Sequence, residues 1–133
     1  MAAEIEFRDL SPNERKMLDR MLSIPFPGRA ELLEQARHAS ARRVGPEPGI
    51  EFQVTPTAKA QVHWRVPVEG ETIDTDGVPI LILLHIVDGM INELEFFKGD
   101  LSEIVGPIAP DSISVRLSTY PRPTSRQQLS ESD

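Results

Sequence analysis

The sequence contains no cysteine, and this absence excludes several kinds of chemistry at once. Without thiols there is no disulfide framework, no thiolate nucleophile and no metal site built on cysteine ligands. Stability must therefore come from the packing of a hydrophobic core. With 133 residues, the chain is long enough for one domain that contains such a core.

Basic residues and long hydrophobic runs are also scarce. The 14 lysines and arginines face 21 aspartates and glutamates, so the net charge is -7 and phosphate backbones are repelled on average. We therefore expect no nucleic acid among the partners. The longest apolar run, Val78–Leu84, is too short to span a bilayer, and the first ten residues carry charges where a signal peptide needs an apolar segment. We expect no membrane partner and a cytoplasmic location.

Motifs for catalysis, cofactors and metals are missing as well. The sequence has no GxSxG motif, no P-loop and no GxGxxG motif. Its three histidines, His38, His63 and His85, lack the spacing of metal ligands. We therefore predict that the protein is not an enzyme and that it holds no cofactor and no metal.

Two helices are predicted near the N-terminus. Residues 11–14, Ser-Pro-Asn-Glu, are typical of a helix start, because serine caps the helix, proline suits its first position and glutamate completes a capping box. An apolar stripe at helical spacing follows, formed by Met17, Leu18, Met21 and Leu22. Pro25 and Pro27 end this helix, and residues 28–40 predict a second helix beside it.

From residue 41 onward, apolar and polar residues alternate with the period of a strand. Segments 41–44 and 50–54 predict a hairpin with a five-residue loop. Strands near 61–74, 78–87 and 90–98 predict an antiparallel meander, and a short last strand is expected near 113–117.

These elements predict an α+β fold. Two N-terminal helices are expected to pack on one face of an antiparallel sheet of about five strands, arranged as a meander. A single domain is predicted over residues 1–118. Residues 119–133 are polar and contain several serines, prolines and glutamines, so a disordered C-terminal tail is expected.

Two Asp-Gly pairs, at 76–77 and 88–89, determine which residues of the meander should face each other. Asp88-Gly89 between two apolar runs is a strong signal for a hairpin with a two-residue type I′ turn. If both pairs form two-residue loops, one set of side chains lies beneath the helices: Trp64, Val66, Val68, Leu81, Leu83, Leu94 and Phe96. His85 falls on this face opposite Asn92, where it is interpreted as a core histidine with its hydrogen bonds satisfied.

The opposite face of the predicted sheet is the candidate interaction surface. Its middle strand carries four aliphatic residues: Ile80, Ile82, Leu84 and Ile86. Four glutamates flank this stripe: Glu69, Glu71, Glu93 and Glu95. A strand that is apolar on both faces is usually covered on both, so an uncovered stripe predicts a site of association.

This surface leads to three functional hypotheses. The first is a small non-enzymatic binding or interaction protein that uses the face around Ile82, Leu84, Glu93 and Glu95, with a second copy or another protein as its partner. An alternative is an immunity-type antitoxin whose acidic surface binds a basic toxin. From a different class comes a small hydrolase-like enzyme that uses His85 and a sheet glutamate. The enzyme needs both groups on one accessible face, whereas the predicted register places them on opposite faces.

Three segments together resemble a bacterial, actinobacterial-type family of domains of unknown function. They are Leu10-Ser11-Pro12-x-Glu14-Arg15, then Phe26-Pro27-Gly28, then His85-x-x-Asp88-Gly89-x-x-x-Glu93-Leu94-Glu95-Phe96. Members of that family carry the pattern H-x-x-D-G-x-x-x-E-L-E, and the resemblance extends over residues 8–118. It implies an uncharacterised α+β protein and no particular activity.

Overall fold

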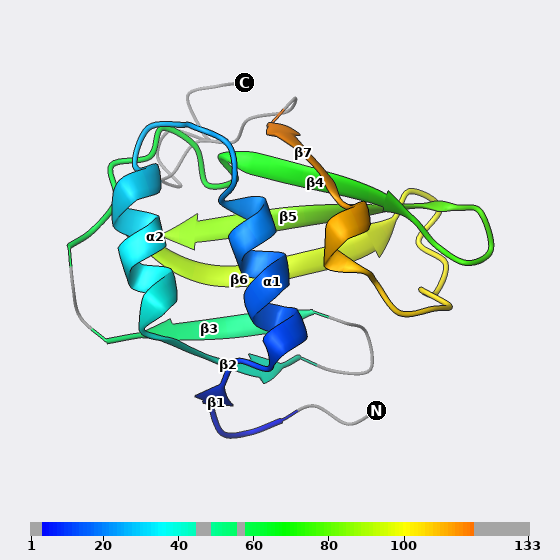
Figure 1. The fold of residues 1–133 in the computed structure, drawn as a ribbon, viewed down its shortest axis with the longest axis horizontal. Helices are drawn as coiled ribbons and strands as arrows, with labels where there is room; N and C mark the ends of the chain where they lie inside the picture. The colour runs from blue at the N-terminus through cyan, green and yellow to red at the C-terminus, as the bar shows by residue number, and fades with distance from the viewer. Residues whose placement is uncertain (1–3, 45–48, 56–57, 119–133) are drawn as a thin grey trace.

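A computed structural model describes residues 4–44, 49–55 and 58–118. Within these residues, two helices lie across one face of an antiparallel sheet of seven strands (Figure 1). The α+β class and the antiparallel sheet are therefore confirmed, but the sheet is larger than the predicted five strands. The predicted tail, residues 119–133, lies outside the described part of the chain.

Helices α1 (Pro12–Met21) and α2 (Arg29–Arg37) form close to where the sequence predicts them. The capping box is present, because the Glu14 amide donates to Ser11 Oγ at 3.1 Å and the Ser11 amide donates to Glu14 Oε1 at 2.9 Å. The predicted stripe of α1 is buried: Met17, Leu18, Met21 and Leu22. Helix α2 is shorter than predicted, because the chain enters a strand at Ala39. Neither helix has the length and apolar character needed to cross a membrane.

The sheet has the strand order β1-β2-β3-β6-β5-β4-β7. Its strands are β1 (Arg8–Asp9), β2 (Ala39–Arg43), β3 (Ile50–Val54), β4 (Val68–Ile73), β5 (Pro79–Val87), β6 (Met90–Lys98) and β7 (Ser114–Leu117). The β2–β3 hairpin and the β4–β5–β6 meander agree with the prediction. The short edge strand β1 was not predicted, and a short 3-10 helix, η1 (Pro110–Ser112), precedes β7.

The Asp88-Gly89 turn forms as predicted. Both residues have positive φ, 52° at Asp88 and 74° at Gly89, and the flanking Val87 and Met90 face each other. Glycine is needed at the second position for a further reason: a Cβ atom there would lie 2.9 Å from the carbonyl oxygen of Ala60.

Beyond this turn, the predicted register of the hairpin is wrong by one residue. Ile86 still faces Ile91, but the next pair along is His85 with Glu93. Asn92 is therefore an extra residue in β6, and it makes a β-bulge.

A second extra residue lies at the other end of β5. The amide of Asp74 donates to the carbonyl of Val78 at 2.9 Å, so the β4–β5 turn contains three residues, 75–77, instead of two. Each extra residue shifts a pairing by one position. Because the pairings of β5 with both β4 and β6 are shifted, the side chains of β5 that were predicted to face the core point away from it, and the others face the core.

This reversal exchanges the two predicted faces of β5. The four aliphatic residues predicted to form an interaction surface lie in the core beneath the helices, with at most 1% of each exposed: Ile80, Ile82, Leu84 and Ile86. Four residues from the neighbouring strands or their flanks are buried as predicted: Val66, Val68, Leu94 and Phe96. Leu81 and Leu83 face away from the core, and Trp64, also predicted to be buried, is 41% exposed.

Candidate functional site

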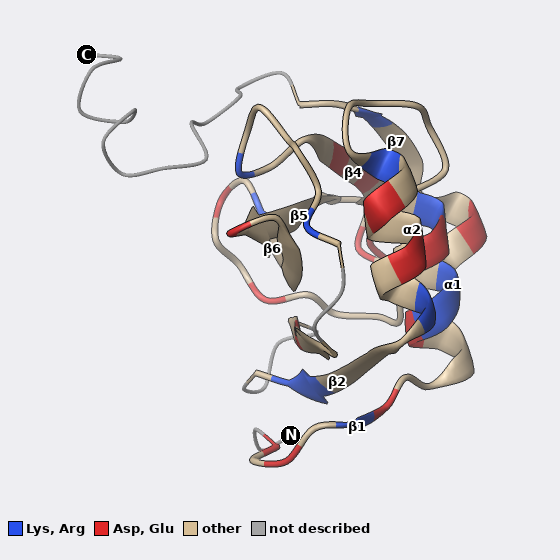
Figure 2. Cartoon of the chain, turned by 90° about the vertical axis from the view of Figure 1, so that its left-hand side faces the viewer, with Lys and Arg blue, Asp and Glu red and all other residues tan. Residues whose placement is uncertain are grey.

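The face of the sheet that points away from the helices carries most of the predicted functional residues. Figure 2 shows α1 and α2 together on one side of the sheet, and no described helix covers the other side, which we call the open face. Three cross-strand rows form it: Arg42, Glu51, Glu93 and His85; Glu95, Leu83, Glu69 and Arg116; and Phe97, Leu81, Glu71 and Ser114. Directly paired residues point to the same side of a sheet.

The four predicted glutamates share the open face, but their apolar neighbours differ from those predicted. Leu81, Leu83 and Phe97 occupy its centre, and each is partly buried. The predicted central stripe of isoleucines and Leu84 lies on the opposite face, in the core. The open face therefore combines glutamates with leucine and phenylalanine side chains.

Arginines neutralise several of these carboxylates. At one edge, Arg42 Nε donates to Glu51 Oε1 at 2.7 Å, and its guanidinium lies 4.4 Å from the ring centre of Phe7. At the other edge, Arg116 donates to Glu69 at 2.9 Å and to Glu71 at 3.2 Å. These pairs hold the outer carboxylates in fixed positions.

His85 lies on the open face, not in the core opposite Asn92 as predicted. Arg65 Nε donates to His85 Nδ1 at 3.1 Å. Because a guanidinium can only donate, Nδ1 carries no proton, and the ring is neutral with its proton on Nε2. That Nε2–H donates to Glu95 Oε1 at 2.8 Å. Both ring nitrogens are therefore occupied by neighbouring side chains.

Glu93 differs from the other glutamates of the open face. It is partly buried between Glu51 on β3 and His85 on β5, and it makes no hydrogen bond or ion pair with any described residue. Burial is the main reason why the pKa of Glu93 is raised; the neighbouring carboxylates of Glu95 and Glu51 add to this shift, whereas the charge of Arg65 opposes it. Glu93 is thus a carboxylate that lies among other carboxylates and that no described cation contacts directly.

This arrangement suits the binding of a cation better than acid-base catalysis. The hydrolase hypothesis requires His85 and a glutamate on one face, and the structure meets that condition. A general base also needs a ring nitrogen free to accept a proton from the substrate, and Arg65 and Glu95 occupy both nitrogens. Within the described residues, no group of three or more histidine, aspartate or glutamate side chains is placed to hold a metal ion.

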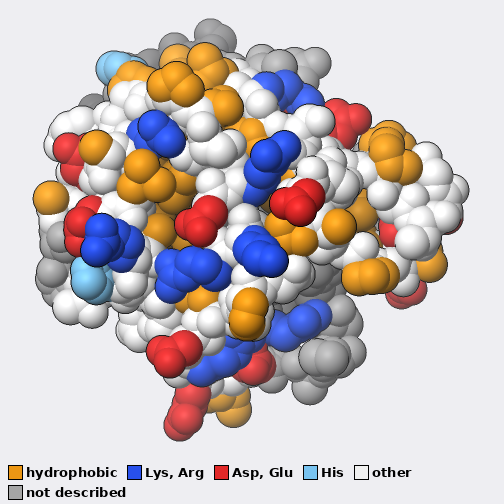
Figure 3. Space-filling view, in the orientation of Figure 1, with side chains coloured by type: hydrophobic (Ala, Val, Ile, Leu, Met, Phe, Trp, Pro, Cys, Tyr) orange, Lys and Arg blue, Asp and Glu red, His pale blue; other side chains and the backbone are white. Residues whose placement is uncertain are grey.

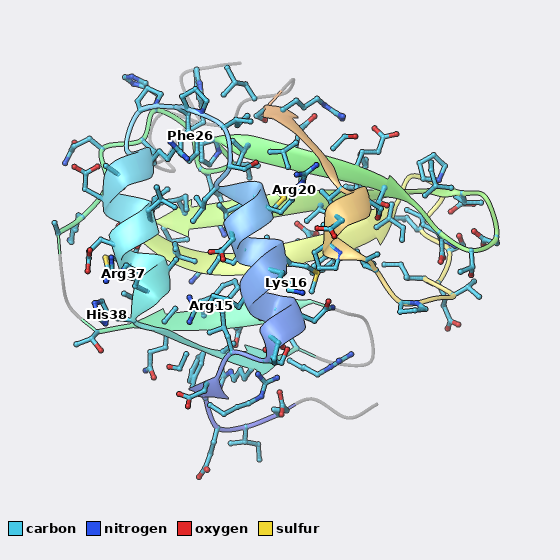
Figure 4. The ribbon with its side chains drawn as sticks, in the orientation of Figure 1. Arg15, Lys16, Arg20, Phe26, Arg37 and His38 are labelled. Carbon is cyan, nitrogen blue, oxygen red and sulfur yellow. The ribbon has the colours of Figure 1, made fainter. Side chains whose placement is uncertain are left out.

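The helix side of the molecule has a different charge pattern. Lysine and arginine side chains cross the outer surface of both helices (Figure 3). They include Arg15, Lys16 and Arg20 on α1 and Arg37 at the end of α2 (Figure 4). Arg20 Nε donates to the Ile113 carbonyl at 2.8 Å, which ties α1 to the start of β7. The helix side therefore presents basic side chains next to the acidic residues Asp19, Glu31 and Glu34 (Figure 2), so its surface is mixed in charge.

Comparison with known protein families found a domain family that matches this chain. The model of a domain of unknown function, DUF6984, matches residues 7–107. The chain belongs to the DUF6984 family. The resemblance to an uncharacterised domain family is confirmed at this level. No curated protein matches the chain, and no solved structure does.

The DUF6984 match contains α1, α2 and strands β2 to β6 in full. His85, Glu93 and Glu95 therefore lie within the DUF6984 domain, together with Arg42 and Glu51. Strand β7, which supplies Arg116 to the outer glutamates, follows the matched region. The row formed by Arg42, Glu51, Glu93 and His85 thus consists entirely of residues of the matched domain.

Proposed function

We propose that this protein is a non-enzymatic binding protein whose open face binds a basic segment of a partner protein. The observation that carries the proposal is Glu93, a partly buried carboxylate that makes no hydrogen bond or ion pair with a cation among the described residues. A lysine or arginine side chain placed against Glu93 supplies the missing hydrogen bonds. It also reduces the repulsion from Glu51 and Glu95.

The apolar centre of the open face supports a protein partner. Leu81, Leu83 and Phe97 provide contact area, and the carboxylates around them select the charge of what binds there. An apolar centre with a charged rim is the usual anatomy of a protein interface. A second copy of the chain would have to bring a basic surface, since its own open face is acidic.

The hydrogen bonds of His85 support a binding role over catalysis. With both ring nitrogens engaged, His85 orients Glu95 and holds Arg65 close to the glutamates. An immunity-type protein that binds a basic toxin is one specific form of this proposal, because such a pair uses the same charge complementarity.

The test uses a capped Arg-Leu-Arg peptide as the basic probe and a capped Glu-Leu-Glu peptide as its charge-reversed control. In NMR titrations, Arg-Leu-Arg is expected to shift the amides of β5 and β6 around His85 and Glu93. The variant Glu93→Gln should weaken that binding about tenfold, because it removes the carboxylate without changing the shape of the site. Glu34→Gln, on the exposed side of α2, makes the same charge change and should have no effect.

Thermal unfolding tests whether the charge of Glu93 destabilises the folded protein. Because its pKa is raised above the usual 4.5, its charge destabilises the fold only as the pH rises above that value. Glu93→Gln should therefore raise Tm by about 1–3 °C at neutral pH and by less near pH 4.5. Equal binding of both peptides, or a lower Tm for Glu93→Gln at neutral pH, would contradict the proposal.

A further inference from the structure

A cavity of about 330 Å³ lies on the helix side of the sheet, away from the open face. It is lined by Ser11, Asn13, Glu14, Met17, Arg43, Ile50, Ile104, Gly106, Pro107 and Ile108. These residues come from the first turns of α1, from the facing ends of β2 and β3, and from the segment before η1. Its volume is at the lower end of the range for small-molecule pockets.

Arg43 is the unusual residue of this cavity. Its Nε is buried and makes no hydrogen bond, and it is the one buried side-chain nitrogen or oxygen in the described residues without such a bond. Other partly buried arginines are bonded: Arg8 to carboxylates, Arg29 to a carbonyl and Arg65 to a histidine. A buried donor without an acceptor is costly, so the position calls for an acceptor from outside the described chain.

The acidic residue of the cavity does not supply that acceptor. Glu14 is engaged by Arg8, whose two Nη atoms lie 2.6 Å and 3.0 Å from its carboxylate oxygens. The amide of Ser11 also donates to it. These bonds lower the pKa of Glu14 despite its burial, which acts in the opposite direction. Glu14 is thus neutralised by Arg8. The carboxylate of Glu4 accepts from the Arg43 backbone amide at 2.8 Å and interacts with the Arg43 charge, but the buried Nε of Arg43 is left without an acceptor.

Asn13 adds donors to the cavity wall. Asn13 is at the second position of α1, where a backbone N–H has no partner within the helix. Its side-chain amide adds N–H donors, and the positive end of the helix dipole favours a negative charge at this place. Arg43 and the start of α1 therefore face the cavity with complementary features for an anion.

The rest of the wall is apolar. Met17, Ile50 and Ile108 are buried at the cavity, and Ile104 and Pro107 complete its apolar side. A bare inorganic anion would leave these side chains without a partner, whereas an organic acid would cover them. We propose that this cavity binds a small carboxylate with an apolar body, its carboxylate against Arg43 and its body among Met17, Ile50 and Ile108.

The experiment compares 4-methylpentanoate with its neutral amide, 4-methylpentanamide, and with inorganic phosphate. The carboxylate is expected to raise Tm at millimolar concentration and to shift the NMR amide signals of Asn13, Met17 and Ile104. The amide and phosphate are expected to do neither. Phosphate that binds as well as the carboxylate would overturn the apolar part of the proposal, and an amide that binds equally would overturn the role of Arg43.

Substitutions test whether 4-methylpentanoate binds in this cavity. Arg43→Met should lower the affinity for 4-methylpentanoate at least tenfold, and it should fold at least as well as the parent because it removes an unbonded buried donor. Arg37→Met, at an exposed position of α2, removes the same charge and should leave the affinity unchanged. If both variants bind the carboxylate as the parent does, the cavity is not its site.

Discussion

At the scale of single residues, Gln35 connects parts of the chain that are far apart in sequence. It is fully buried on α2, and its Nε2 donates to the carbonyls of Ala58 at 3.0 Å and Gly89 at 2.8 Å. Its Oε1 accepts from the amide of Ile91 at 2.9 Å. One side chain thereby bonds to Gly89 in the β5–β6 turn and to Ile91 in β6, and it attaches that turn to the helix layer.

Replacing Gln35 with leucine should destabilise the protein by about 2–4 kcal/mol, because the buried amide of Ile91 loses its acceptor and the carbonyls of Ala58 and Gly89 lose a donor. Urea denaturation at neutral pH measures the change. The control, Arg37→Leu, introduces the same side chain at an exposed position two residues along α2 and should cost little. A Gln35→Leu protein as stable as the parent would show that these bonds do not hold the turn.

At the scale of elements, the bulge in β6 determines what each face of the hairpin carries. Ile91 and Leu94 are both buried although they are three residues apart, and Asn92 and Glu93 lie between them. In a regular strand, residues three apart point to opposite faces. The bulge returns the strand to its core face after Ile91 and leaves Glu93 on the open face.

Because Asn92 is the extra residue, its deletion should leave the fold intact. Without it, Ile91, Glu93 and Leu94 alternate regularly, and the pairs Ile86–Ile91 and Leu84–Leu94 are kept. We expect a folded protein that loses less than about 2 kcal/mol of stability, as measured by urea denaturation and NMR.

The matched control is deletion of Glu95 from the same strand. This change turns Phe96 and Lys98 out of the core and should abolish folding. If deletion of Asn92 abolishes folding as deletion of Glu95 does, the bulge does more than restore the alternation of core and open-face residues in β6.

At the scale of the whole molecule, a buried ion pair connects three segments at one end of the sheet. Lys98 Nζ, at the end of β6, lies 2.8 Å from Asp74, which follows β4, and 2.7 Å from Asp76 in the β4–β5 turn. Asp74 also accepts from the amides of Val105 and Gly106, at 2.6 Å and 2.9 Å. The hydrogen bond from Lys98, followed by that from Val105, holds the pKa of Asp74 far below its usual value.

Replacing Lys98 with methionine should therefore cause a large loss of stability at neutral pH, because Asp74 stays buried without its cation. The lowered pKa means that the stabilisation by Asp74 is present above its ordinary value of 3.8 and is lost as the pH falls below it. The difference in Tm between the parent and Lys98→Met should narrow in that acidic range. Lys16→Met, on the exposed side of α1, should show no such difference at either pH.

Much of the local structure could be predicted because its signals lie within a few neighbouring residues. The capping box at Ser11 needs only the next three positions, and the turn at Asp88 needs only a following glycine. The grouping of the glutamates on one face was also predictable from the alternation of β4 and β6. A visible sign of the bulge is the polar pair Asn92-Glu93, which interrupts the alternation between Ile91 and Leu94.

The contacts around the candidate site were harder to predict from the sequence. Arg65 lies twenty residues from His85, and no local pattern connects the two before the chain folds. The assignment of the isoleucine stripe to the surface failed because both faces of β5 are apolar, so hydrophobicity alone does not choose between them. Only His85 distinguishes the faces, and the structure places it beside Glu95, where its ring nitrogen finds an acceptor.

The sequence by itself determined the α+β class, the helix start at Ser11, the antiparallel hairpins and the turn at Asp88-Gly89. Each of these follows from residues close together in the chain. Only the tertiary structure decided which face of β5 enters the core. That choice depends on the extra residue in the β4–β5 turn, on the bulge at Asn92 in β6, and on the distant anchors Gln35 and Lys98. A single extra residue reverses every side chain of a strand, and the energy that selects one register comes from contacts across the whole sheet.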